Sequence, residues 1–215
     1  MSRIKEIHDY LIERGKTIEE LIELDHSSVY LSFEIMEYAH RNQKRVNGED
    51  YANHPARCLQ NYRDLVGIKD DDYNCIDKDL MYEYDIPFDG VQEVCLLHDV
   101  VEDECFTIDE LEEIFNECDL GIYFKLYIKD ALINITHNYD VEYLEYIKIC
   151  MENPISAICK MMDLQDNLYI LSLIKFDEKN YERASKYLSC LYIINLKYQF
   201  IENINKYRIE FKNSK

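Results

Sequence analysis

The chain has 215 residues, of which 47% are hydrophobic, and its 43 acidic and 24 basic residues give a formal net charge of −19. This length can bury the core of one domain, with or without a helical extension. The negative charge argues against binding to nucleic acid or to an anionic membrane, because both need clustered Lys and Arg. No apolar run approaches the ~18 residues of a membrane span.

Glycine, proline and cysteine usage narrows the class of protein further. Five glycines and three prolines are too few for a turn-rich sandwich or barrel. The eight cysteines form no CxxC pair and stand mostly among apolar residues. We therefore expect reduced core cysteines in a cytoplasmic protein, and the N-terminus does not resemble a signal peptide.

Apolar residues recur mainly at helical spacing, so the predicted fold class is all-α. Capping boxes begin at Thr17 and Thr107, Asn153 precedes a first-turn proline, and Asp89 can cap the helix that follows it. The predicted helices are 17–24, 28–43, one beginning at residue 54, and then 90–101, 107–117, 121–137, 140–151, 154–176 and 178–211.

This pattern predicts three parts. Residues 1–27 form an N-terminal helical segment, residues 28–176 form the main domain, and residues 177–215 form a C-terminal helix. Residues 68–89 are acidic, include Asp70-Asp71-Asp72 and show no clear period, so we interpret them as an insert or flap. The tyrosine- and isoleucine-rich face of the last helix is expected to be core packing.

The run HDVVED, residues 98–103, places polar groups directly behind an apolar stretch. In a helix, His98, Asp99, Glu102 and Asp103 can overhang one cleft. Burying them unpaired would cost several kcal/mol, which a bound divalent cation would remove. A helix end whose acids are simply solvated is the alternative.

Two further segments carry candidate site residues. His54 stands before Pro55 at the end of a polar loop, a position where a lone histidine is usually structural. Lys160, Asp163 and Asn167 follow at i, i+3 and i+7, on one stripe of a predicted helix, with Asp166 alongside. Met161, Met162 and Leu164 flank that stripe, so a site is favoured over a solvated face, although either remains open.

The order His…His-Asp…Asp resembles the signature of HD-domain metal-dependent phosphohydrolases. The fuller pattern is similar to the hydrolase domain of RelA/SpoT-type stringent-response enzymes and their small stand-alone relatives. It runs from AHRNQKR (39–45) through GEDY (48–51) and His54-Pro55 to LLHDVVED (96–103), and ends in KMMDLQDN (160–167). The likeness spans roughly residues 28–175 and implies an HD-domain helical bundle with a C-terminal extension.

The resemblance implies a role for each matching residue. The metal ligands would be His54, His98, Asp99 and Asp163. Glu102 and Asp103 would position and activate the attacking water. Arg45 would contact the nucleotide base or ring, and Asn167 the sugar. Apart from the resemblance, the charges of Arg41, Lys44, Arg45 and Lys160 would favour an anionic substrate near the ion. The mixed N/O ligand set suits several divalent ions, and family precedent favours Mn²⁺.

The implied activity is hydrolysis of a nucleotide, with guanosine 3′-diphosphate alarmones as the first candidates for the substrate. Three departures bear on that substrate. Asp50 stands where the family loop usually has proline, and DLQDN lacks the usual arginine and histidine. The stretch between His54 and His98 is also longer than usual, because of the acidic segment 68–89. A hydrolase of another nucleotide or dinucleotide phosphate and a nonenzymatic nucleotide-binding protein remain alternatives. The oligomeric state stays open.

Overall fold

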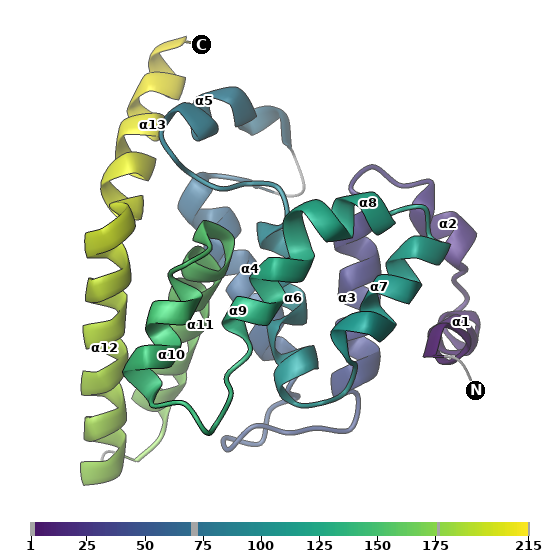
Figure 1. Cartoon of the computed structure of the whole chain (residues 1–215), viewed down its shortest axis with the longest axis horizontal. Helices are drawn as coiled ribbons and strands as arrows, with labels where there is room; N and C mark the ends of the chain where they lie inside the picture. The colour runs from purple at the N-terminus through teal and green to yellow at the C-terminus, as the bar shows by residue number, and fades with distance from the viewer. Residues whose placement is uncertain (1–2, 70–72, 176, 215) are drawn as a thin grey trace.

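The computed structural model describes residues 3–69, 73–175 and 177–214. These residues form helices and loops and contain no β-strand, which confirms the all-α prediction (Figure 1). In chain order the elements are α1 (Arg3–Glu13), α2 (Ile18–Ile22), α3 (Ser27–His40), α4 (Asn53–Val66), the 3₁₀ turn η1 (Tyr73–Cys75), α5 (Lys78–Glu83), α6 (Val91–Glu102), α7 (Ile108–Glu117), α8 (Gly121–Tyr123), the π-helical turn η2 (Phe124–Ile128), α9 (Lys129–Ile135), α10 (Tyr143–Cys150), α11 (Pro154–Leu173), α12 (Glu178–Tyr198) and α13 (Phe200–Ser214).

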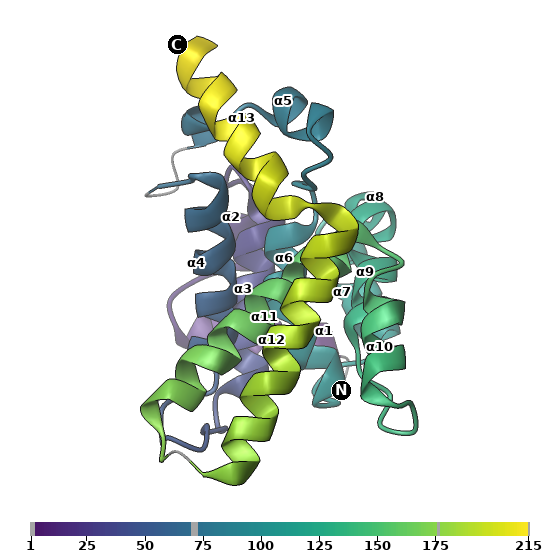
Figure 2. The same cartoon turned by 90° about the vertical axis from the view of Figure 1, so that its left-hand side faces the viewer.

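Helix α6 lies at the centre of the bundle and packs against α3, α4, α9 and α11 (Figures 1 and 2). Every residue from Val91 to Val100 is buried, including the polar Gln92, Glu93, His98 and Asp99. A helix surrounded on all sides by protein needs no amphipathic stripe. His98 and Asp99, in the second-last turn of the helix, are therefore inside the molecule.

Local capping signals placed several helices correctly. Thr17 and Thr107 each form a complete capping box, with Glu20 and Glu110 as the reciprocal partners. Asn153 accepts hydrogen bonds from the backbone N–H groups of Ile155 and Ser156 at the start of α11. These interactions are short in sequence, so the sequence alone shows them.

The expected cap at Asp89 is wrong. Helix α6 begins after Gly90, whose φ of +82° lies in the left-handed region. The Asp89 carboxylate instead accepts a hydrogen bond from the Tyr82 hydroxyl at 2.5 Å and pairs with Lys78 at 3.3 Å. A Cβ at position 90 would also lie 2.6 Å from the carbonyl oxygen of Tyr127, so this turn requires glycine.

The C-terminal part, expected as one helix over 177–215, is two helices. The chain turns at Gln199, which has φ +53°, and the backbone N–H of Ile201 donates to the Asn195 side chain at 3.0 Å. After this turn α13 buries Phe200, Ile204 and Tyr207. The turn lets α13 bury these three side chains, which a straight continuation of α12 would direct elsewhere.

The described part of the segment 68–89 is folded against α13. Met81 and Ile86 are buried, and the Tyr207 hydroxyl accepts a hydrogen bond from the backbone N–H of Asp77 at 3.1 Å. Both views show α5 beside α13. Asp70-Asp71-Asp72 lie outside the described residues.

Helix α12 only partly confirms the expected core packing. Cys190 and Ile194 are buried, whereas a stripe of its residues is exposed: Tyr181, Leu188, Tyr192 and Leu196. All eight cysteines are free and six of them are buried, as expected for small core residues. Within the described ranges, none of the helices has the length and hydropathy that crossing a bilayer would need.

Candidate metal centre

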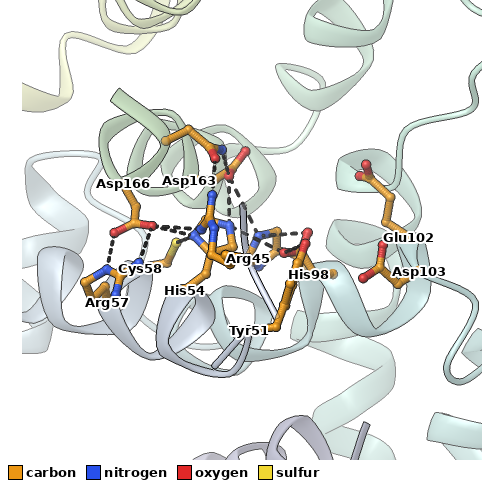
Figure 3. Close-up of polar contacts among 12 residues, drawn as sticks. Arg45, Tyr51, His54, Arg57, Cys58, His98, Glu102, Asp103, Asp163 and Asp166 are labelled. Atoms are coloured by element: carbon orange, nitrogen blue, oxygen red, sulfur yellow. Dashed lines mark hydrogen bonds and ion pairs between the residues drawn. The ribbon is translucent and has the colours of Figure 1, made fainter. Parts of the chain in front are cut away.

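The four residues that the resemblance marks as metal ligands meet in one place, although they come from three helices. His54 lies in the first turn of α4, His98 and Asp99 lie near the end of α6, and Asp163 lies midway along α11. Their exposed fractions are 2%, 3%, 8% and 5%, respectively. Packing of α4 and α11 against α6 brings these distant segments together (Figure 3).

Both imidazoles turn their Nε2 atoms toward both carboxylates. The Nε2 atom of His54 lies 3.2 Å from Asp163 Oδ1 and 3.4 Å from Asp99 Oδ2. The Nε2 atom of His98 lies 3.2 Å from Asp99 Oδ1 and 4.0 Å from Asp163 Oδ1. Two imidazole nitrogens and two carboxylates thus surround one point, a donor set that suits a divalent transition metal.

The hydrogen bonds of the two rings leave both Nε2 atoms available. His98 Nδ1 donates to the backbone carbonyl of Cys95 at 2.9 Å, and His54 Nδ1 donates to Asp166 at 2.7 Å. Within the described chain, the buried Nε2 of His98 has no hydrogen-bond partner. A buried lone pair of this kind is costly unless something binds it, and a cation fits that requirement.

Polar neighbours fix the two carboxylates. The Tyr51 hydroxyl donates to Asp99 Oδ2 at 3.0 Å. Lys160 Nζ lies 2.7 Å from Asp163 Oδ2, and the Asn167 side chain donates to Asp163 Oδ1. Lys160 and Asn167, expected to bind substrate, therefore both contact an expected metal ligand.

The electrostatics of the cluster match these contacts. Burial favours the neutral form of Asp163, but the Lys160 ammonium and the His54 imidazole outweigh burial and hold the Asp163 pKa well below its usual value. Burial also opposes the charge on His54, yet the carboxylates of Asp163 and Asp166 raise the pKa of His54 well above 6.5. The metal-free site thus attracts a proton to the place where a cation would bind.

The acid pair Glu102 and Asp103 lies at the end of α6, beside the ligand cluster (Figure 3). Glu102 accepts two hydrogen bonds of 3.3 Å, from the backbone N–H of His137 and from the Tyr139 hydroxyl. Asp103 accepts one of 3.4 Å from Gln43. Burial and the nearby Asp99 raise the pKa of both carboxyls, which suits groups that exchange protons.

Arg45 reaches the same region but is held by protein groups. Its guanidinium donates to Asp166 at 3.1 Å and to Asn167 at 2.7 Å. The other two expected cations are occupied elsewhere: Arg41 lies over the Tyr38 ring and Lys44 pairs with Asp50. Of the four basic residues considered, Arg45 and Lys160 alone line the cavity at the site.

That cavity has a volume of about 170 Å³. Its lining includes three phenol rings and an imidazole, from Tyr143, Tyr146, Tyr187 and His137. Tyr187 belongs to α12, so the C-terminal extension contributes to the cavity. A larger cavity of about 490 Å³ lies between Phe88, Tyr127 and Tyr198, but it holds no cluster of metal-ligating groups among the described residues.

Sequence reasoning missed several residues of the site. Arg57 donates two hydrogen bonds to the carboxylate of Asp166 and also pairs with Glu49 at 2.7 Å. The Tyr51 hydroxyl donates to Asp99. The spacing of Arg57 three residues after His54 is a signal that places both on one helix face. The pairing with Asp166, more than a hundred residues away, has no signal in the sequence.

Cys58 is a further group that the sequence did not single out. His54, Cys58 and His98 offer ligand atoms within 4.8 Å of one another. The Cys58 thiol, however, lies 3.7 Å from Nδ1 of His54, the nitrogen that faces away from Asp99 and Asp163. Burial raises the Cys58 pKa to about 12, so in the absence of a metal ion it is a protonated thiol at neutral pH.

Comparison with solved structures supports the fold. The structure of a metazoan ortholog of SpoT, described as hydrolysing ppGpp and acting in starvation responses, matches with a TM-score of 0.52 and 18% sequence identity. The match covers 87% of this chain and 97% of that chain. No family model matches the sequence, and no curated protein matches it significantly. The chain therefore shares the all-helical fold of a SpoT-like hydrolase.

Proposed function

We propose that the protein is a metal-dependent phosphohydrolase that acts on a nucleotide. The observation that carries this proposal is that the Nε2 atoms of His54 and His98 each lie within 4.0 Å of the carboxylates of both Asp99 and Asp163. These four residues would hold one divalent cation, with Mn²⁺ as the first candidate. When bound, such a cation acts as a Lewis acid toward phosphoryl oxygens and lowers the pKa of water.

Protein side chains would carry out proton transfer and bind the anionic substrate. Glu102 lines the cavity, and its raised pKa suits a general base that takes the proton of the attacking water, with Asp103 beside it. Arg45 and Lys160 supply positive charge for an anionic substrate, and Asn167 accepts a hydrogen bond from Arg45. Local charge of this kind can outweigh a distant net charge of −19, because salt screens beyond about 8 Å.

The substrate we propose first is a guanosine nucleotide that carries a 3′-pyrophosphate. The likeness in fold to a ppGpp hydrolase supports this choice. The cavity, at about 170 Å³, can enclose the reacting phosphate groups while the rest of a nucleotide lies outside it. Other nucleotides or dinucleotide phosphates could present the same groups, so substrates must be compared directly.

The test is to load the protein with Mn²⁺ and measure pyrophosphate released from ppGpp, alongside phosphate or pyrophosphate released from a nucleotide panel. Asp99→Ala serves as the inactive control. Turnover of ppGpp above the panel supports the alarmone assignment, and turnover of another nucleotide alone redirects it. Nucleotide binding without turnover by the wild type would leave a binding protein, and the hydrolase proposal would be rejected.

A further inference from the structure

His54 presents two nitrogens to two different environments. Its Nε2 atom faces Asp163 and Asp99 at 3.2 and 3.4 Å, whereas Nδ1 lies 2.7 Å from Asp166 Oδ2 and 3.7 Å from the Cys58 sulfur. A neutral imidazole has one lone pair, so one of the two nitrogens can bind an ion. An ion bound at Nε2 would have oxygen ligands, and an ion bound at Nδ1 would be near a thiol.

Asp166 decides between these two environments. Its carboxylate is 1% exposed and accepts hydrogen bonds from Arg57 in a fork, from Arg45 at 3.1 Å and from His54. Two guanidinium groups keep Asp166 ionised, and an ionised carboxylate only accepts hydrogen bonds. Nδ1 of His54 must then carry the proton, which leaves the lone pair on Nε2.

Arg57 connects this arrangement to the loop before α4. One edge of its guanidinium binds Asp166, and its two terminal nitrogens also bind Glu49 at 3.0 and 2.7 Å. Glu49 belongs to the loop that also carries Tyr51, the partner of Asp99. The chain of charges therefore holds α4, the loop and α11 in one arrangement around His54.

We infer that Asp166 is a positioning residue that selects Nε2 of His54 as the ligand atom and so directs the ion to the carboxylates instead of to Cys58. This inference rests on the metal site of the proposed function. It predicts a preference for ions that accept mixed nitrogen and oxygen ligands, such as Mn²⁺, over binding of thiophilic ions through sulfur.

The test compares Asp166→Asn with wild type, using Mn²⁺ alone and Cd²⁺ alone as probes. Asparagine keeps the shape but removes the charge that fixes the imidazole proton. Asp166→Asn is expected to bind Mn²⁺ about 10- to 100-fold more weakly, the usual loss when such a partner is removed. It is also expected to show more ultraviolet cadmium–thiolate absorption than the wild type, and the excess should disappear when Cys58→Ser is added to Asp166→Asn, because the other seven cysteines are the same in all these proteins. Asp130→Asn, an exposed carboxylate on α9, is the matched control and should bind both ions as wild type does.

A folded Asp166→Asn protein that binds Mn²⁺ as tightly as wild type would overturn the inference, as would wild-type cadmium–thiolate absorption that Cys58→Ser removes. If Asp166→Asn does not fold, ¹⁵N NMR of Zn²⁺-loaded wild type decides: a proton on Nδ1 of His54 supports the inference and a metal on Nδ1 overturns it. Wild type that binds no Mn²⁺ contradicts both this inference and the proposed function. Unaltered Mn²⁺ binding in the variant, with an active wild type, removes this inference alone.

Discussion

The last turns of α6 carry two pairs of polar residues that the protein treats differently. His98 and Asp99 are buried and lie within 4.0 Å of groups from α4 and α11. Glu102 and Asp103, one turn further, are more open and accept only long hydrogen bonds of 3.3 to 3.4 Å. Fixed buried groups suit the binding of an ion, and loosely held carboxyls with raised pKa values suit proton transfer.

The largest effect is expected from replacing the residues that face His98 and Asp99 across the site. His54→Ala or Asp163→Ala should abolish stoichiometric Mn²⁺ binding and reduce hydrolysis to background, because each removes one of four donors. Most of the helicity should survive, since neither side chain belongs to the apolar core. Elemental analysis after gel filtration, together with far-ultraviolet circular dichroism, measures both. A variant that keeps its metal would show that the ligand assignment is wrong.

A substitution in the more open pair, Glu102 and Asp103, should lower catalysis without weakening metal binding. Glu102→Gln should lower the hydrolysis rate by about 10²- to 10⁴-fold, the usual contribution of a general base, while Mn²⁺ affinity stays near wild type. Initial rates and calorimetric titration provide the two readouts. Glu113→Gln, an exposed carboxylate on α7, should change neither. Equal loss of both properties in Glu102→Gln would place Glu102 among the ligands.

Mn²⁺ binding at the buried pair should depend on pH through its partner His54. Cation binding competes with the His54 proton, whose pKa is raised above 6.5, so Mn²⁺ affinity should fall up to about tenfold per pH unit below that pKa. In the metal-free protein, the charged His54 contributes stability below about pH 6.5 that is lost as pH rises through its folded-state pKa. Titrations and thermal unfolding between pH 5.5 and 9 measure these trends. Mn²⁺ affinity that is independent of pH over this range would contradict them.

The smallest effect is expected far from both pairs, at the turn between α12 and α13. Gln199 has φ +53°, so Gln199→Gly should relieve backbone strain and stabilise the protein by up to about 1 kcal/mol. Chemical denaturation measures this change, and Mn²⁺ affinity should not move. A substantial loss of metal binding would show that the turn and the site are coupled.

The sequence predicted the features that depend on neighbours in the chain. The capping boxes at Thr17 and Thr107 are local, and the helical period gave the fold class. The turn at Gln199 depends on what α13 packs against, which no local pattern records. Likewise, the sequence showed Asp166 beside a candidate site, but its role follows from Arg57 and His54, which only the tertiary fold brings near.

The most direct test of the central claim is anomalous diffraction from a crystal grown with Mn²⁺. We expect one manganese peak within bonding distance of Nε2 of His54, Nε2 of His98 and the carboxylates of Asp99 and Asp163. A peak on the Cys58 side of His54, or a structure in which His54 and Asp163 point into a pocket away from His98 and Asp99, would contradict it.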